Sequence, residues 1–265
     1  MKALRFGILV FAVLLVFAVS HAQPVKKPVL SPKAELQLKM PAGEGTNSCS
    51  VAWNPDDEKY YSAMVGNESY PLEVFDAKGK HLQTTATGAD IRGLWYSPRV
   101  NWLEANLYDY QNVIAYELDS AGLLTEEFPE EVAFELEVYE PQAALAYNTE
   151  TNELLWFEAS SMTIYFIDRD YDLTSRYIDL KVPVGDTALN PYCVGYTGVK
   201  GYEYAILNHL QKKVYLISDE TEAVTATITL PAKAVVPETF GFCFANGRIW
   251  LFNNETRTWT AFKVF

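Results

Sequence analysis

The sequence predicts an all-β chain built from five repeats. Five short apolar segments each end in an aromatic residue, at Trp53, Tyr96, Tyr147, Tyr196 and Phe244, and the steps between them are 43, 51, 49 and 48 residues. A period of this length is typical of repeats that each form a small sheet, and not of short helical repeats. Hydrophobic residues make up 49% of the chain and aromatic residues 14%. Because aromatic and β-branched side chains fit pleated surfaces, this composition favours a folded chain of strands over a disordered one.

A second marker recurs inside the first four repeats. Apolar segments stop at an aspartate that follows the aromatic residue by 23, 23, 21 and 23 residues. The four copies are LEVFDAKGK at Asp76, IAYELDSAG at Asp119, IYFIDRDYD at Asp168 and VYLISDETEA at Asp219. An aspartate side chain can accept a hydrogen bond from the backbone two residues further on, so these residues predict tight turns and need no catalytic role.

Each repeat contains four short strands. In the fourth repeat they are YCVGYT, YEYAILN, KVYLISD and AVTATITL, separated by short polar turns, which predicts one antiparallel sheet. The strand that ends in the aromatic residue has a bulky face and a small-residue face, as closely packed innermost strands require. The bulky positions, two residues before the aromatic, are Val51, Leu94, Leu145, Val194 and Phe242. Trp95 is the exception on the small-residue face.

The fifth repeat ends without an outer strand, and the chain start supplies a candidate. KAELQLKM, residues 33–40, alternates apolar and polar residues as a half-buried strand does. We therefore predict a β-propeller of five four-stranded blades, with the last blade closed by the N-terminal strand, so that no long sheet edge is left unpaired. Six blades is the main alternative, because residues 129–140 fit the repeat least well.

Over about residues 29–265, the blade rhythm resembles the secreted β-propeller-repeat proteins of the NHL-like and PQQ-like kind. Trp-Asp repeats, Kelch double glycines and sialidase-type aspartate boxes are absent from the sequence. The resemblance therefore implies a fold and leaves the function open.

The first 22 residues have the pattern of a secretory signal. Lys2 and Arg5 precede an apolar run, residues 6–19, and Ser20-His21-Ala22 offers a small-residue cleavage site. An uncleaved anchor helix is the alternative interpretation. We expect residues 1–22 to be a signal peptide, 23–32 a linker and 33–265 a single domain that is secreted or periplasmic and has no transmembrane segment in its mature form. The formal net charge of −13 makes nucleic acid a poor partner.

Few residues suit proton transfer or metal binding. Only His81 and His209 lie beyond the signal, one in an expected outer strand and one in a turn. Cys49, Cys193 and Cys243 lie on expected inner strands and are most simply explained as small buried residues, although an exported chain can form disulfides. The sequence predicts no metal site and identifies no cofactor.

Oxygen-bearing side chains gather before the inner strands. Six residues before each aromatic stand Asn47, Asp90, Pro141, Asn190 and Glu238, with Arg92 and Tyr192 two residues further into their strands. Loops at this end of the blades converge on one mouth of the central channel, so we predict ligand contact with Asn47, Asp90, Arg92, Asn190, Tyr192 and Glu238. Such oxygens could hold a hard cation or act as acid and base on a sugar, but Asn and Asp are also ordinary turn formers.

Three functions fit these observations. The leading hypothesis is an exported, non-catalytic binding module for a peptide, a glycan or an envelope protein, and we expect it to be a monomer. A carboxylate-dependent glycosidase or related hydrolase is the second, and a structural envelope or matrix component is the third. The geometry of the channel mouth separates these hypotheses. Two carboxylates facing each other across an open pocket would favour the hydrolase, and a mouth filled by aromatic side chains would not.

Overall fold

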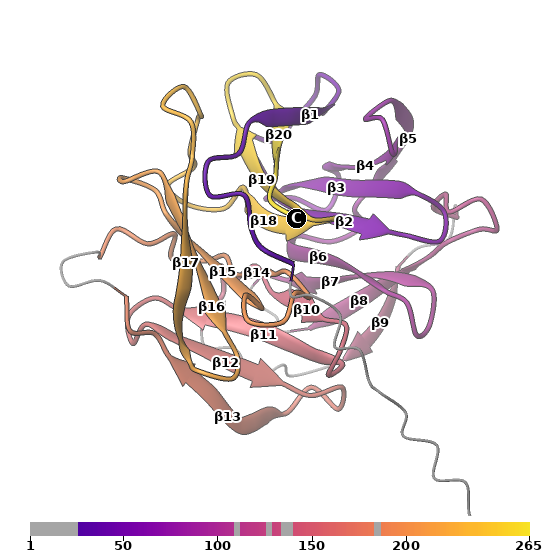
Figure 1. The fold of residues 1–265 in the computed structure, drawn as a ribbon. Helices are drawn as coiled ribbons and strands as arrows, with labels where there is room; N and C mark the ends of the chain where they lie inside the picture. Colours follow the sequence, from indigo (N-terminus) through magenta and orange to yellow (C-terminus); the bar gives the residue numbers. More distant parts are fainter. Residues whose placement is uncertain (1–25, 109–111, 126–128, 134–139, 183–186) are drawn as a thin grey trace, which may run out of the picture.

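The computed structural model describes residues 26–265 apart from 109–111, 126–128, 134–139 and 183–186. The described residues form five four-stranded antiparallel sheets and no helix. Figure 1 shows the sheets arranged around a central axis, with β2, β6, β10, β14 and β18 innermost. The prediction of a five-bladed β-propeller is confirmed. The expected signal peptide lies outside the described residues, and no described segment is a helix long and apolar enough to cross a membrane.

The blades follow the chain in order. Blade 1 contains β2 (Asn47–Asn54), β3 (Lys59–Val65), β4 (Pro71–Asp76) and β5 (His81–Ala86), and blade 2 contains β6 (Ile91–Ser97), β7 (Trp102–Leu107), β8 (Val113–Glu117) and β9 (Glu130–Ala133). Blade 3 contains β10 (Ala146–Asn148), β11 (Glu153–Glu158), β12 (Thr163–Ile167) and β13 (Leu173–Asp179). Blade 4 contains β14 (Gly195–Tyr196), β15 (Tyr204–Asn208), β16 (Lys213–Ser218) and β17 (Ala223–Thr229), and blade 5 contains β18 (Phe242–Ala245), β19 (Arg248–Asn253), β20 (Thr258–Lys263) and β1 (Ala34–Lys39).

Blade 5 joins the two ends of the chain. Its strand order is β1-β20-β19-β18, so the N-terminal strand is the outer strand of the last blade, as predicted. The register places Leu38 opposite Trp259, and both side chains are fully buried. Beyond the strand, the Met40 backbone N–H donates to the Arg257 carbonyl over 2.9 Å. Closure thus rests on backbone pairing and on an apolar contact.

The predicted aspartate turns occur in three blades of the four. The carboxylates of Asp76, Asp119 and Asp168 each accept a backbone N–H from the residue two positions on, over 2.8 to 2.9 Å. In blade 4 the Ser218 carbonyl accepts the turn bond from the Glu222 N–H instead, over 2.9 Å. This frees the Asp219 carboxylate to contact Arg176 and Tyr204.

The inner strands approach so closely that they pair across blades. The Ala144 N–H donates to the Tyr192 carbonyl over 2.8 Å, and the Val51 N–H reaches the Cys243 sulfur at 3.1 Å. All three cysteines are buried and free of disulfides, and burial raises the pKa of the Cys49 thiol to about 11 and that of Cys193 to about 12. Unreactive thiols inside the ring agree with the prediction that they are small buried residues.

Trp95 breaks the small-residue pattern because it packs towards blade 3. Its indole N–H donates to the Glu104 carboxylate over 2.8 Å, and its ring lies in an apolar cluster with Leu145 and Tyr147. The indole therefore fills the space between neighbouring blades.

Candidate functional site

The channel has two ends, and the sequence prediction concerned the one where the inner strands begin. We call it the strand-start mouth, defined by Asn47, Asp90, Asn190 and Glu238 with Arg92 and Tyr192. The opposite end is the strand-end funnel, defined by Trp53, Tyr96, Tyr147, Tyr196 and Phe244. These two places differ in how they are filled.

Arg92 occupies much of the strand-start mouth. Its guanidinium is ion-paired with Asp90, and its Nε donates to the Gln142 side chain over 2.8 Å. The same group lies 4.3 Å from the Tyr108 ring centroid and 5.9 Å from that of Phe240. Arg92 is only 5% exposed, so its side chain is buried and packed between blades.

Asn190 and Tyr192 reinforce the same packing. The Asn190 amide is fully buried; it donates to the Phe240 carbonyl over 3.2 Å and accepts the backbone N–H groups of Tyr192 and Cys193. The rings of Tyr192 and Phe240 stack with centroids 5.1 Å apart. The structure therefore brings Asp90, Arg92, Asn190, Tyr192 and Phe240 into one connected, aromatic-filled cluster.

Asn47 and Glu238 stand apart from that cluster. The Asn47 side-chain oxygen accepts the Asn254 amide over 2.8 Å, and Glu238 is exposed with no hydrogen bond or ion pair to another described residue. The Asp90 carboxylate is committed to Arg92 and to the Gly66 backbone N–H at 2.8 Å. Among the described residues, no acidic pair of the kind a glycosidase needs is apparent in these contacts. Ligand contact at the strand-start mouth stays a prediction.

The strand-end funnel contains a cavity. Its volume is about 390 Å³, within the size range of small-molecule sites. All five blades line it, with the aromatic residue of each inner strand in the wall. The turns that follow these strands form the rim through Pro55, Pro98, Thr149, Gly198 and Gly247.

The wall of the funnel holds aromatic rings, hydroxyls and amides but no Asp, Glu, His, Lys or Arg. Burial raises the pKa of Tyr196 to about 12 and also raises that of Tyr96. Burial likewise raises the pKa of the Cys243 thiol well above its ordinary value. The side chains of this wall are therefore uncharged near neutral pH, which suits a neutral ligand, and the Asp56 carboxylate lies just outside the wall, 3.5 Å from the Tyr96 hydroxyl.

Two of the ring hydroxyls are held by the turns beside them. The Tyr96 hydroxyl donates to Asn101 over 2.8 Å, and the Tyr147 hydroxyl donates to Asn152 over 2.6 Å. Both asparagines have the left-handed backbone that Asn tolerates better than most residues, with φ of 57° and 63°. These bonds fix the orientation of two rings before any ligand arrives.

Sequence reasoning missed the funnel although its signal was present. The recurring aromatic residues mark strand ends, and because they alternate with small neighbours they also share a face with Val51, Leu94 and their equivalents. Five rings at equivalent ends of five inner strands must surround the axis. The sequence does not show that Arg92 and Phe240 pack together in the strand-start mouth, because they are far apart along the chain.

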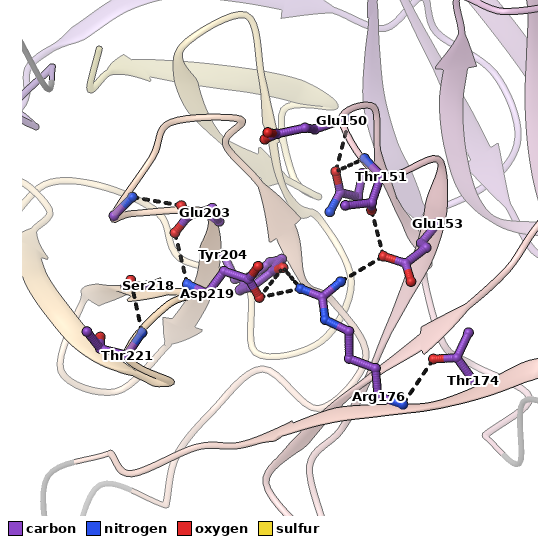
Figure 2. A network of polar contacts seen from close by, with 12 residues as sticks. Glu150, Thr151, Glu153, Thr174, Arg176, Glu203, Tyr204, Ser218, Asp219 and Thr221 are labelled. Atoms are coloured by element: carbon purple, nitrogen blue, oxygen red, sulfur yellow. Dashed lines mark hydrogen bonds and ion pairs between the residues drawn. The ribbon is translucent and has the colours of Figure 1, made fainter. Parts of the chain in front are cut away.

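A separate polar network joins blades 3 and 4 and is shown in Figure 2. Arg176 of β13 is ion-paired with Glu153 over 2.8 Å and with Asp219, and its Nη2 donates to the Tyr204 hydroxyl over 3.1 Å. Its guanidinium lies 3.8 Å from the Phe166 ring centroid. The single Arg176 guanidinium binds carboxylates from both blades, so the network holds the two blades together. Among the described residues, no cluster of His, Cys, Asp or Glu could hold a metal ion.

Comparison with one solved structure supports the architecture. No protein-family model and no curated protein matches the chain. The glutaminyl cyclase of Myxococcus xanthus is similar in structure, with a TM-score of 0.57 at 13% identity over 91% of this chain and 98% of that one. The β-propeller domain of Cps50 (Swd1) from Myceliophteria thermophila matches with a TM-score of 0.44 at 12% identity, over 84% of this chain and 85% of that one. The fold and the funnel together define the chain as a five-bladed β-propeller with an aromatic cavity at one channel mouth.

Proposed function

We propose that the protein is an exported, non-catalytic binding module that holds a neutral saccharide in the strand-end funnel. The observation that carries this proposal is the funnel wall itself, which combines six aromatic residues, Trp95 among them, with hydroxyl and amide groups and contains no charged side chain. A sugar ring offers an apolar face for stacking and a rim of hydroxyls for hydrogen bonding. Such a ligand matches a mostly apolar pocket with a few polar groups.

Binding is better supported than catalysis by the same wall. The glutaminyl cyclase of similar fold is an enzyme, but a likeness at 13% identity concerns the fold alone. Acid–base chemistry near neutral pH needs a group that titrates there. No Asp, Glu, His, Lys or Arg side chain lines the funnel, and burial raises the pKa of Tyr196 to about 12.

The test is a titration of neutral oligosaccharides into the protein, followed by calorimetry and by thermal shift. A ligand that binds the folded state raises the melting midpoint. Trp53→Ala should weaken binding at least tenfold, because Trp53 lines the funnel and is only half-buried. Tyr177→Ala, which removes an exposed ring from β13, is the matched control and should leave affinity unchanged.

The strand-start mouth is tested in the same titrations. The double variant Asp90→Ala/Glu238→Ala should bind as the unaltered protein does if the funnel is the site. A saccharide lost on this change but retained by Trp53→Ala would move the site to the strand-start mouth. Conversion of the saccharide, or of a peptide with N-terminal glutamine, during the same incubations would overturn the non-catalytic assignment.

Export is proposed from the first 22 residues and has its own test. N-terminal sequencing of the protein from the envelope or the medium should begin at Gln23. An intact Met1 on cytoplasmic protein would contradict the proposal.

A further inference from the structure

A second cavity lies between blade 5 and the segment that links blade 4 to it, away from the funnel. It encloses about 580 Å³ and is bounded by one face of blade 5 and by the chain that follows β17. The residues that line it are Lys33, Ala34, Gln37, Pro231, Lys233, Ala234, Val235, Leu251, Asn253, Thr256, Thr258, Thr260 and Phe262. We call this cavity the blade 4–5 cleft. It shares no lining residue with the funnel.

The repeat explains why the cleft is open. In each blade, the aromatic residue of the first strand pairs with a residue of the second strand, which in turn pairs with a residue of the third strand. The residue two positions before that one on the third strand occupies an equivalent position in all five blades. Its occupants in blades 1 to 5 are Glu73, Ile114, Tyr165, Tyr215 and Thr260. Blades 2, 3 and 4 thus fill the place with a large apolar or aromatic side chain. In blade 5 Thr260 leaves it part-empty.

The floor of the cleft is apolar and its sides can form hydrogen bonds. Leu251 and Phe262 are buried at its base, and threonine hydroxyls and the Asn253 amide stand beside them. Val235 is 53% exposed although it belongs to the cleft wall. An exposed valine next to a buried apolar floor is a surface that an apolar ligand group would cover.

The charge of the cleft opposes that of the whole chain. Its only charged lining residues are Lys33 and Lys233, and no carboxylate lines it, whereas the chain carries a formal net charge of −13. Within the described part of the chain, neither lysine is in an ion pair, and nearby Glu35 is engaged by Arg248 at 3.4 Å. Two ammonium groups above an apolar floor would attract an anionic group and leave its apolar portion to the cleft.

The wall that carries Lys233 is held in place. Lys212 donates through its ammonium group to the carbonyls of Ala232 and Ala234, each over 2.8 Å, and the Ala234 N–H donates to the Pro231 carbonyl over 2.8 Å. The cleft is therefore preformed on this side, which reduces the entropy lost on binding.

We propose that the blade 4–5 cleft binds an amphipathic carboxylate, a small organic anion whose carboxylate contacts Lys33 and Lys233 and whose hydrocarbon portion lies on Leu251 and Phe262 beneath Val235. This site is independent of the saccharide site in the funnel.

The test uses a matched pair of probes, octanoate and octylammonium, titrated into the protein by calorimetry at low salt. Octanoate should bind saturably with a Kd below about 1 mM, and octylammonium should bind at least tenfold more weakly. Lys33→Gln/Lys233→Gln should weaken octanoate binding at least tenfold. Lys78→Gln/Lys80→Gln, which removes the same charge from the turn of blade 1, should leave it unchanged.

Filling the cleft provides a second variant. Thr260→Tyr installs the residue that blades 3 and 4 carry at the equivalent place and should abolish octanoate binding, with circular dichroism confirming a folded protein. Trp53→Ala should not affect octanoate, which separates this site from the funnel.

Three outcomes would overturn the proposal. They are the absence of saturable octanoate binding, equal binding of octylammonium, and octanoate binding that survives both the lysine and the Thr260 changes. Sedimentation at the same concentrations provides a further check. A dimer that Thr260→Tyr dissociates would assign the cleft to a second copy of the chain instead.

Discussion

Leu38 of the N-terminal strand lies opposite Trp259 of the last β-hairpin, and this pairing closes the ring. The two residues are separated by nearly the whole domain in sequence, yet both are completely buried. In a propeller, each blade is covered by its neighbours, so one open blade would expose an edge and an apolar face together. Closure is therefore a condition for the stability of every blade.

Removal of residues 23–42 should cause aggregation or a large loss of thermal stability, measured against a chain that begins at residue 23. A milder change, Leu38→Ala, should lower the free energy of unfolding by about 2–4 kcal/mol, because it leaves a cavity beside Trp259. Chemical denaturation measures this. A shortened chain that melts as the longer one does would refute closure by the N-terminal strand.

Gly93→Ala should destabilise the protein by about 1–3 kcal/mol. A Cβ at this inner-strand position would lie 2.7 Å from the Leu145 backbone nitrogen in blade 3, and a backbone atom cannot rotate away as a side chain can. Gly43→Ala is the matched control, because nothing lies within 4 Å of its added Cβ. Equal urea midpoints for the two variants would contradict the view that inner-strand spacing limits residue size.

Arg169 and Arg176 each join two blades, but the loss of one should cost more stability than the loss of the other. Arg169 makes two hydrogen bonds of 2.7 Å to Glu104, whose side chain is 1% exposed, so Arg169→Ala leaves a buried carboxylate unpaired and should cost about 3–5 kcal/mol. The partners of Arg176 are more exposed, with Asp219 at 37%, so Arg176→Ala should cost only about 1 kcal/mol.

Replacing the buried pair together separates charge burial from packing. Arg169→Met combined with Glu104→Leu should recover part of the loss caused by Arg169→Ala, because no unpaired charge remains, although the Trp95 indole N–H loses its acceptor. Denaturant midpoints of the three variants decide this, and a double variant as unstable as the single one would show that packing dominates.

Stability should fall above about pH 10. Burial raises the pKa of Tyr116 and Tyr204 far above the ordinary value and that of Tyr171 and Tyr196 to about 12. In the unfolded chain these phenols ionise near pH 10, so the folded state holds more protons above that pH. Their contribution is complete below pH 10 and is lost as pH rises through the folded pKa values, by about 1.4 kcal/mol per pH unit for each phenol.

Urea midpoints between pH 9 and 11.5, with tyrosinate absorbance followed in parallel, measure this effect. Tyr116→Phe should remove one phenol's share of the alkaline slope, although it also loses the 2.6 Å hydrogen bond to the Thr87 carbonyl. Tyr177→Phe, at an exposed position, should leave the slope unchanged. An alkaline slope identical in all three proteins would disprove the assignment to buried phenols.

The fold could be predicted because the same sequence pattern recurs at nearly regular intervals along the chain. Spacing of Trp53, Tyr96 and their equivalents set the number of blades, and the alternation in residues 33–40 located the closing strand. Local chemistry also predicted the turns at Asp76, Asp119 and Asp168, but not the exchange of roles at Asp219, which depends on an arginine from the neighbouring blade.

The site was harder to predict because openness is a property of five blades at once. Arginine is a residue type that often contacts ligands, so the sequence suggested this role for Arg92. In the structure its guanidinium instead packs against the rings of Tyr108 and Phe240, which come from separate parts of the chain. The cleft beside Thr260 was within reach of the sequence, since superposing the repeats places a threonine where Ile114, Tyr165 and Tyr215 stand. The sequence would still not have shown that Lys33 and Lys233 line the same cleft, because they are far apart along the chain and do not occupy equivalent positions of the repeat.

The place of β1 in the last blade also bears on the order of events during synthesis. A ribosome makes β1 first and its partner β20 last, so the first strand must wait, unpaired, until about 220 further residues have been made at roughly 5–20 residues per second. Blades 1 to 4 can assemble from neighbouring hairpins in the meantime, whereas the final step joins the most distant segments and bears the largest loop-closure entropy. The slow phase of folding should therefore be the capture of β1, and a short synthetic peptide spanning residues 33–40 should compete for that place only before the ring has closed.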